Sequence, residues 1–278
     1  MSDLLARRDA ATGADLVELR LDGIADVDAA AALAGRAMPA VVTCRPVWEG
    51  GRYDGPERVR LALLEAAVEA GAEFVDVEWR ADRSALRRGA RVVLSMHDFT
   101  GLPADLGRHV AAMRAAGAAI VKVAVRAARL ADCVALRDAA AGGDRQVLIA
   151  MGAAGLITRV CPWLFGSCWT YAGAAAPGQV ATAALRTVYR VGETSCGTRV
   201  FGVSGGWEAA SARAAAHNAE FRARGLDAVS VPLAAADADD LQTAARAFDL
   251  AGLVAAGRLA EADLPEHASV DVDRWMGT

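Results

Sequence analysis

The stretch Ala119–Val125 reads AIVKVAV, and together with its neighbours in the chain it decides the fold. The apolar run Arg91–His97 (RVVLSMH) precedes it, and the run Gln146–Met151 (QVLIAM) follows it. Between Ala119–Val125 and Gln146–Met151, the segment Ala127–Ala140 has the apolar spacing of a helix. Short apolar runs that alternate with helical stretches predict parallel strands joined by crossover helices.

The same alternation continues on both sides of this stretch. Further strands are predicted at Ala14–Asp22, Ala40–Arg45, Phe74–Trp79 and Cys168–Gly173, and further helices at Asp3–Ala11, Pro56–Ala70 and Asp105–Ala116. Seven strand–helix units at near-regular spacing within about the first 190 residues predict an α/β fold of the (β/α)8 TIM-barrel type rather than an open sheet.

Composition restricts the classes of protein that fit. The 278 residues are 54% hydrophobic and 23% charged, with a net charge of -4 and a pI near 5.6, which argues against nucleic acid or an anionic membrane as the main partner. No apolar run reaches the roughly 18 residues of a membrane span. The N-terminus, MSDLLARRDA, lacks a signal pattern, so we expect a cytoplasmic protein.

Lysine is almost absent from the chain. Lys and Arg together number 30, yet Lys122 is the only lysine. An arginine stays charged, whereas a buried lysine can lose its proton and attack a carbonyl. His97 stands at the end of the preceding predicted strand, and the unperturbed pKa of a histidine, near 6.5, suits proton transfer. The pair predicts carbonyl chemistry at neighbouring strand ends.

Other ionisable residues stand in or just after the apolar runs. They are Glu18, Arg20, Arg45, Glu78, His97, Lys122 and Arg159. Because a charge within an apolar strand is costly unless it is paired or functional, and barrel active sites collect at the C-terminal strand ends, we expect these side chains to converge.

Cysteine and histidine give no sign of a metal centre. The five cysteines are odd in number without CxxC spacing, which indicates free thiols that fill small apolar gaps. The four histidines show no ligand spacing such as HExxH, so no metal site is expected.

Six ordered motifs carry a resemblance to a known family. They are ELRLD (Glu18–Asp22), TCRPVWEGG (Thr43–Gly51), SMHDF (Ser95–Phe99), VKVAV (Val121–Val125), MGAAGLITRV (Met151–Val160) and APGQ (Ala176–Gln179). Over about residues 1–187 the chain resembles the type I 3-dehydroquinate dehydratases, which are lyases of the shikimate pathway that use a Schiff base.

The resemblance implies a role for each matching residue. Lys122 would form the imine with the C3 ketone of 3-dehydroquinate, and His97 would remove the C2 proton and then protonate the departing C1 hydroxyl, giving 3-dehydroshikimate. Glu49 would orient His97. The implied substrate-binding residues are Glu18, Arg20 and Arg45 for the ring hydroxyls, and Arg159 with Gln179 for the carboxylate side. No metal or diffusible cofactor is implied.

The sequence departs from the family pattern in two places within this region. The first predicted helix begins almost at Met1, so the strand that normally opens the family's barrel is missing. Either the true start lies upstream, the chain is truncated, or the barrel is impaired, because seven strands leave two exposed edges. Ala175 occupies the position of a family serine, which removes one hydroxyl contact to the substrate.

The rest of the chain predicts a second domain. After a linker at Val191–Arg199, strands are expected at Val200–Ser204 and Asp227–Pro232, and helices at Glu208–Arg224 and Asp237–Ala247. Residues 199–260 resemble part of a shikimate dehydrogenase substrate-binding domain, through FGVSG (Phe201–Gly205) and AAHNAEFRARGLDAVSVPL (Ala215–Leu233), with 261–278 as a tail.

This second domain lacks the resembled family's catalytic features. Only Ser211 remains of that family's serines, and the region contains no lysine. No GxGxxG fingerprint of a nicotinamide-binding domain follows a strand. Dehydrogenase activity is therefore not expected, and a packing or dimerisation module, hence a homodimer, is the alternative that remains.

Two further functions stay open on sequence alone. A class I aldolase or another Schiff-base lyase shares the lysine chemistry, although it would not require the arginine set and the APGQ loop together. A catalytically impaired pseudoenzyme or metabolite-binding module would account for the missing strand, Ala175 and the incomplete second domain.

Overall fold

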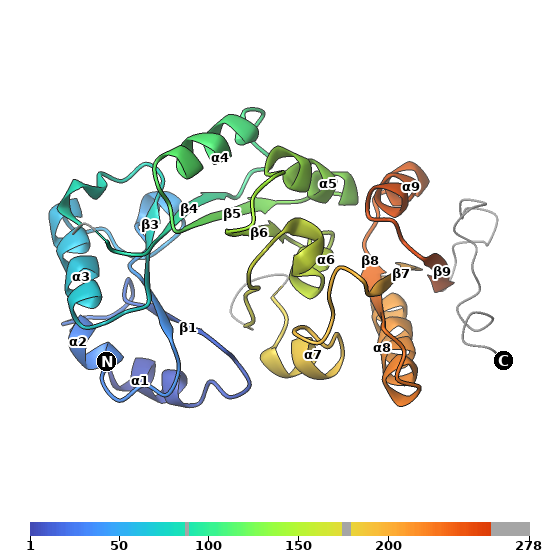
Figure 1. Ribbon diagram of the computed structural model, residues 1–278, viewed down its shortest axis with the longest axis horizontal. Helices are drawn as coiled ribbons and strands as arrows, with labels where there is room; N and C mark the ends of the chain where they lie inside the picture. Colours follow the sequence, from blue (N-terminus) through green and yellow to red (C-terminus); the bar gives the residue numbers. More distant parts are fainter. Residues whose placement is uncertain (87–88, 174–178, 257–278) are drawn as a thin grey trace. The chain divides into compact units, whose positions relative to one another are not determined.

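The computed structural model describes residues 1–86, 89–173 and 179–256, and it contains the strand–helix repeat that the sequence predicts (Figure 1). The strands are β1 (Val17–Arg20), β2 (Ala40–Thr43), β3 (Phe74–Glu78), β4 (Val92–Asp98), β5 (Ile120–Arg126), β6 (Gln146–Met151), β7 (Arg199–Gly205), β8 (Ala228–Leu233) and β9 (Gly252–Ala256). The helices are α1 (Ser2–Asp9), α2 (Ala29–Leu33), α3 (Glu57–Glu69), α4 (Leu106–Ala115), α5 (Leu130–Ala139), α6 (Leu156–Val160), α7 (Thr182–Thr187), α8 (Trp207–Ala223) and α9 (Ala238–Ala247). Short 3-10 helices are η1 (Val47–Glu49), η2 (Arg83–Ala85) and η3 (Pro162–Phe165).

These elements fall into two compact units. Unit 1 contains Met1–Asp98 and Arg108–Val123, and unit 2 contains Phe99–Gly107 and the described residues from Ala124 onwards. A six-stranded half-barrel sheet has the order β1-β2-β3-β4-β5-β6, and the boundary between the units falls within β5. The expected α/β fold of the barrel type is confirmed.

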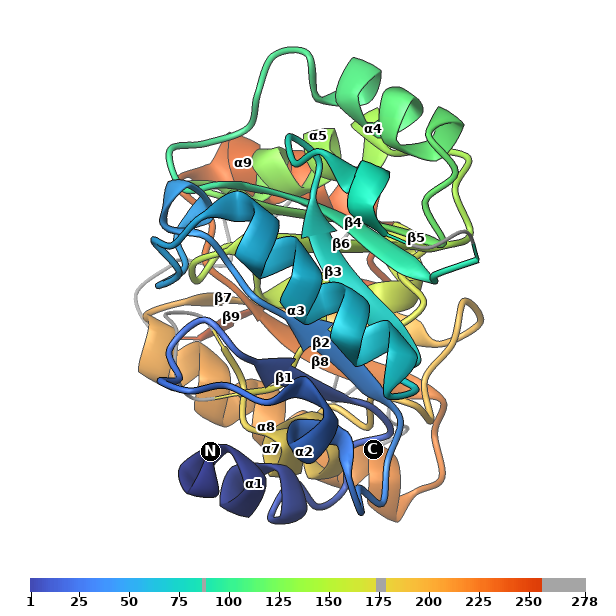
Figure 2. The same cartoon turned by 90° about the vertical axis from the view of Figure 1, so that its left-hand side faces the viewer.

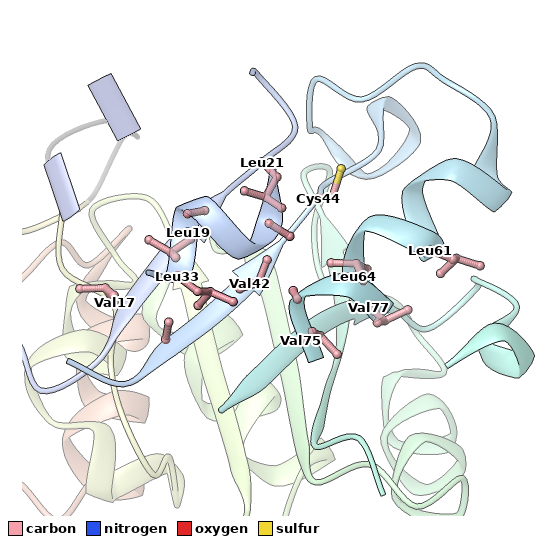
Figure 3. Packing of buried hydrophobic residues seen from close by; sticks show 14 residues of the cluster. Val17, Leu19, Leu21, Leu33, Val42, Cys44, Leu61, Leu64, Val75 and Val77 are labelled. Carbon is pink, nitrogen blue, oxygen red and sulfur yellow. The ribbon is translucent and has the colours of Figure 1, made fainter. Parts of the chain in front are cut away.

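Each inner strand of unit 1 alternates between two buried faces. Val75 and Val77 on β3 point to one face, where they join a core with β1, β2, α2 and α3 (Figure 3). Asp76 and Glu78 point to the other face and are also fully buried. Because side chains alternate along a strand, one face of the sheet carries the core and the other carries the charges.

Helix α3 is fixed to this sheet by a buried arginine. The helix begins after Pro56, ends before Gly71, and lies over β2 and β3 in Figure 2. Arg60, fully buried on it, donates to the carbonyl of Cys44 at 2.9 Å and pairs with Glu57 at 2.6 Å. Its Nη1 also lies 2.6 Å from Glu78 Oε2, at a geometry that suits an ion pair rather than a hydrogen bond. Arg60 therefore links the helix to the charged face.

One predicted strand is wrong. Cys168–Gly173 does not form a strand, and the only pairing described there is an isolated bridge between Gln146 and Ser167. The β-prone residues of CWTYAG favoured a strand, but a strand also needs a ladder of partners. After the Cys168 N–H donates to the Gln146 carbonyl, the ladder stops. The short helices α2, α6 and α7 and the strand β9 were not predicted.

In unit 2 a second sheet has the order β8-β7-β9, with its strands parallel. Helix α8 packs along this sheet, and in Figure 1 α8 and α9 flank it.

Asp240 at the start of α9 is fully buried and accepts the N–H groups of Leu130 and Ala131 at 3.0 and 2.8 Å. Arg137 donates to the carbonyl of Ala247 at 2.6 Å. Residues 199–256 are therefore hydrogen-bonded to α5 within the same unit, and the division of domains at residues 190–199 stays a prediction.

Candidate active site

The segment that follows β2 is folded back tightly and holds Glu49. The Tyr53 N–H donates to the carbonyl of Arg45 at 3.1 Å, and Gly50 ends η1 with φ of +75°, a conformation that favours glycine. A Cβ on Gly51 would overlap the Arg45 carbonyl oxygen. The two glycines of TCRPVWEGG are thus needed for a loop that brings Glu49 back over the sheet.

Asp76 is the centre of the charged face. Its Oδ1 accepts from Arg45 Nη2 at 2.7 Å and from Ser95 Oγ at 2.6 Å, while its Oδ2 accepts from Lys122 Nζ at 2.9 Å. Burial alone would raise the pKa of Asp76, but the cations Arg45 and Lys122 and the hydrogen bond from Ser95 hold that pKa well below its usual range. Asp76 is therefore ionised at neutral pH.

Arg45 joins the two acidic residues of β3. Besides Asp76 it donates through Nη1 to Glu78 Oε1 at 2.6 Å and to Ser95 Oγ at 2.7 Å. Burial would lower the pKa of Arg45, but Asp76 and Glu78 raise it. Burial raises the pKa of Glu78 in spite of the opposing charge of Arg45. A buried guanidinium with three acceptors is held in one orientation.

Lys122 lies on β5 and is only 4% exposed. Its Nζ is 2.9 Å from Asp76 Oδ2 and 3.8 Å from Glu18 Oε1. Glu18 in turn accepts from Thr43 Oγ1 at 2.6 Å. Glu18, Arg45 and Lys122, which the sequence suggested separately, are thus linked in one group in unit 1.

Glu49 and His97 form a second pair in unit 1. Glu49 Oε2 is 2.8 Å from His97 Nδ1 and accepts the His97 backbone N–H at 3.1 Å. Burial raises the pKa of Glu49 to about 7. Burial, together with the cations Arg45 and Lys122, lowers the pKa of His97 well below its ordinary value. His97 is therefore uncharged at neutral pH, with one ring nitrogen held by a carboxyl group.

Arg20 differs from these buried residues because its side chain is 47% exposed. Its Nε and Nη2 donate to the two oxygens of Asp22 at 2.7 and 2.8 Å. This bidentate contact raises the pKa of Arg20. Asp22 also accepts the N–H of Arg52 at 3.1 Å, so it anchors Arg20 to the segment that carries Glu49.

Arg159 and Gln179 belong to unit 2. Arg159 is 4% exposed, its Nη1 donates to the Tyr171 carbonyl at 3.3 Å, and its Nε has no hydrogen-bond partner within the described residues. Burial lowers the pKa of Arg159. Gln179 lies against Gly173, whose N–H donates to Val180. The prediction about Ala175 and most of the APGQ motif lies outside the described residues.

Sequence reasoning missed three polar residues of the charged face, and it noted Glu78 without giving it a role. The three are Asp76, Ser95 and Arg60. A signal was present for Asp76, because FVDVE places two acids two residues apart on one side of an otherwise apolar strand. No pattern marked Ser95 or Arg60, since a serine in a strand and an arginine in a helix are ordinary.

Among the described residues, no group of three or more His, Cys, Asp or Glu side chains could hold a metal ion. All five cysteines are free thiols. Cys44, Cys133 and Cys161 are buried, as expected of thiols that fill apolar gaps, but for Cys168 and Cys196 that expectation is wrong because both are exposed. None of the helices in the described part of the chain is long and apolar enough to cross a membrane.

The fold and this site define a class of protein, namely α/β half-barrel proteins with a buried lysine and a carboxyl–histidine pair on one face of the sheet. The family can be stated more narrowly. The family model of type I 3-dehydroquinase matches residues 2–195, and the chain belongs to that family.

Curated relatives agree with this assignment. The 3-dehydroquinate dehydratase of Desulfotalea psychrophila is 35% identical over 196 residues, which cover 64% of this chain and 87% of the relative. The bifunctional chloroplastic 3-dehydroquinate dehydratase/shikimate dehydrogenase of Arabidopsis thaliana is 30% identical over 240 residues. That match covers 80% of this chain but only 40% of the Arabidopsis protein, and it continues beyond the dehydratase region.

Solved structures show the same fold. The 3-dehydroquinate dehydratase of Geobacillus kaustophilus superposes with a TM-score of 0.57 at 29% identity, over 67% of this chain and 83% of that one. The dehydroquinate dehydratase and shikimate dehydrogenase structure from S. pombe covers 92% of this chain and 54% of its own, with a TM-score of 0.57. At 21% identity it supports the fold alone.

Proposed function

We propose that this chain dehydrates 3-dehydroquinate to 3-dehydroshikimate through an imine on Lys122. The observation that carries the proposal is a buried lysine, in a member of the type I 3-dehydroquinase family, held by Asp76 on the same face as Glu18 and Arg45. A lysine is the residue that forms imines with ketones, and no other lysine exists in the chain.

The steps of the proposed reaction balance. The Lys122 ammonium gives up one proton and the resulting amine adds to the C3 ketone. The carbinolamine oxygen takes up that proton and leaves as water, which gives a cationic iminium. His97 removes the C2 proton, and the C2–H electrons flow into the iminium to give an enamine. The enamine then expels the C1 hydroxyl, which takes the proton from His97 and departs as water. Hydrolysis of the conjugated iminium releases 3-dehydroshikimate and regenerates the Lys122 ammonium, so the net change is the loss of one water.

The Glu49–His97 contact supports the role of His97 as the base. With Glu49 ionised, the Nδ1–H of His97 donates a hydrogen bond to the carboxylate, so the neutral imidazole carries its basic lone pair on Nε2, which would accept the proton. The lowered pKa keeps the imidazole neutral before the reaction. Once His97 is protonated, the Glu49 carboxylate stabilises the imidazolium, and the same group can return the proton to the leaving hydroxyl.

Charged and polar side chains of both units are proposed to bind the substrate. In unit 1, Glu18, Arg20 and Arg45 would take the ring hydroxyls. In unit 2, Arg159 would take the carboxylate with help from Gln179. A buried guanidinium without an acidic partner among the described residues suits a carboxylate ligand.

The proposal is tested by following enone absorbance as 3-dehydroquinate is added to the pure chain. We expect turnover by the wild type and none by Lys122→Arg, which keeps the charge but cannot form an imine. Binding without enone formation by the wild type would overturn the proposal and favour a metabolite-binding protein. Full activity of Lys122→Arg would overturn the imine.

We also propose that residues 199–256 contribute no shikimate dehydrogenase activity. The motivation is that the resembled family uses a lysine and this region has none. A spectrophotometric assay with shikimate and the oxidised nicotinamide cofactors should show no reduction of the cofactor. Measurable reduction that persists in a Lys122→Arg variant would refute this.

A further inference from the structure

We propose that Asp76 is a positioning residue that holds the reactive nitrogen of Lys122 and provides the counter-ion of the iminium formed there. The inference rests on the proposed function, since it assigns a role within that reaction. Asp76 would act through Lys122 and would not itself exchange a proton with the substrate.

The geometry assigns a different partner to each oxygen of Asp76. Oδ1 is taken by Arg45 at 2.7 Å and by Ser95 at 2.6 Å, which leaves Oδ2 for Lys122 at 2.9 Å. Arg45 and Ser95 therefore fix the orientation of the carboxylate through Oδ1. Oδ2 then fixes the position of the Lys122 nitrogen. Lys122 and Asp76 lie on different strands, so this contact fixes a long side chain that otherwise has several rotatable bonds.

Burial strengthens the electrostatic interaction between Asp76 and the Lys122 nitrogen. Asp76 is fully buried and Lys122 is 4% exposed, so little water screens their interaction. The reaction converts an ammonium into an iminium on the same nitrogen, and both are cations. A carboxylate already aligned with that nitrogen stabilises the positive charge at each stage without reorganisation, which is the usual source of electrostatic catalysis.

The substitution Asp76→Asn affects the two oxygens of Asp76 differently. The asparagine amide keeps one acceptor oxygen, which the two donors Arg45 and Ser95 would claim. The amide NH2 would then face Lys122, and it has no lone pair to accept from the lysine nitrogen. Asp76→Asn therefore removes the counter-charge and the positioning contact of Lys122, whereas the side that holds Arg45 keeps an acceptor.

The test compares wild type and Asp76→Asn for turnover and for borohydride trapping with 3-dehydroquinate. We expect kcat to fall by about 100-fold or more and the trapped adduct to form more slowly, with KM changed by only a few-fold. A purely structural role would lower the folded fraction, and with it the final amount of adduct, but would leave kcat and the trapping rate constant per folded molecule unchanged. Asp240→Asn is the matched control, because Asp240 is an equally buried, ion-paired acid in unit 2, and it should trap at the wild-type rate.

The outcomes separate this inference from the function it rests on. If the wild type neither turns over nor forms an adduct, the proposed function fails. If the wild type does both and folded Asp76→Asn equals it in kcat and trapping, only the role of Asp76 is overturned.

A second variant covers the case in which Asp76→Asn does not fold, since it leaves buried cations less compensated. Asp76→Glu keeps the charge but displaces the carboxylate by one methylene, and we expect kcat to fall roughly tenfold while the adduct still forms. Unchanged kcat in Asp76→Glu would contradict positioning by this carboxylate.

Discussion

Glu49→Gln should make the protein more stable at alkaline pH while it lowers activity. Glu49 is 6% exposed, and burial raises its pKa from the ordinary 4.5 to about 7. The folded chain therefore holds a proton on Glu49 at pH values where the unfolded chain has released it. A carboxyl group with a raised pKa contributes stability below its unfolded pKa, and that stability is lost as pH rises through the folded pKa.

The magnitude follows from the two pKa values. Each unit of difference corresponds to about 1.4 kcal/mol, so ionised Glu49 lowers the free energy of unfolding by about 3 kcal/mol above pH 7 relative to pH 4.5. Glutamine has a similar shape and does not titrate. The stability of Glu49→Gln relative to the wild type should therefore increase by about 3 kcal/mol between pH 4.5 and pH 8.

Urea unfolding at several pH values measures this difference directly. Glu73→Gln is the control, because the pKa of Glu73 is lowered and its contribution to stability changes with pH in the opposite direction. Although burial opposes it, the Ala40 N–H and the Arg36 guanidinium lower the pKa of Glu73, so its contribution grows as pH rises to about 6 and is then constant. A stability difference between Glu49→Gln and wild type that does not change between pH 4.5 and 8 would show that folding does not raise the pKa of Glu49. A concurrent loss of turnover, by at least about tenfold, is expected because an uncharged amide cannot stabilise the imidazolium that His97 becomes.

Four further predictions follow from the described contacts. The kcat/KM of the wild type should fall about tenfold per pH unit below pH 7 as Glu49 takes up its proton, and a profile that stays flat down to pH 5 would contradict this. Gly51→Ala should lower the free energy of unfolding by about 2 kcal/mol in urea titrations, because its Cβ would overlap the Arg45 carbonyl; wild-type stability would show that the loop yields easily. Asp240→Ala should lower stability by about 3 kcal/mol by leaving the Leu130 and Ala131 N–H groups without an acceptor, and a loss below 1 kcal/mol would argue against the attachment of α9 to α5. Arg159→Met should raise KM by about 10- to 100-fold without loss of stability, whereas an unchanged KM would remove it from the substrate site.

Much of the fold could be predicted because local patterns and tertiary contacts agree. Six of the seven predicted strands of the first region exist, most of them within two residues of the expected ends, because each is a short apolar run between helical stretches. Cys168–Gly173 failed since its residues favour a strand but have only one bridging partner. The strand β9 (Gly252–Ala256) was missed because GLVAA is short and alanine-rich, and it becomes a strand only by pairing with β7.

The site was predictable to the extent that unusual residues marked it. Lys122 and the motif residues of the first half lie in unit 1, and Lys122, Glu18 and Arg45 are joined there by direct contacts or through Asp76. The pairing of each charge was not predictable. Whether Asp76 contacts Lys122, Arg45 or Arg60 depends on strand register, which no local pattern specifies.

The proposed reaction depends on a covalent imine between Lys122 and the substrate. This imine is tested by incubating the wild-type chain with 3-dehydroquinate and borohydride, digesting it, and measuring peptide masses. We expect one reduced adduct, located on the peptide that contains Lys122. Turnover of 3-dehydroquinate with no adduct on that peptide would contradict it.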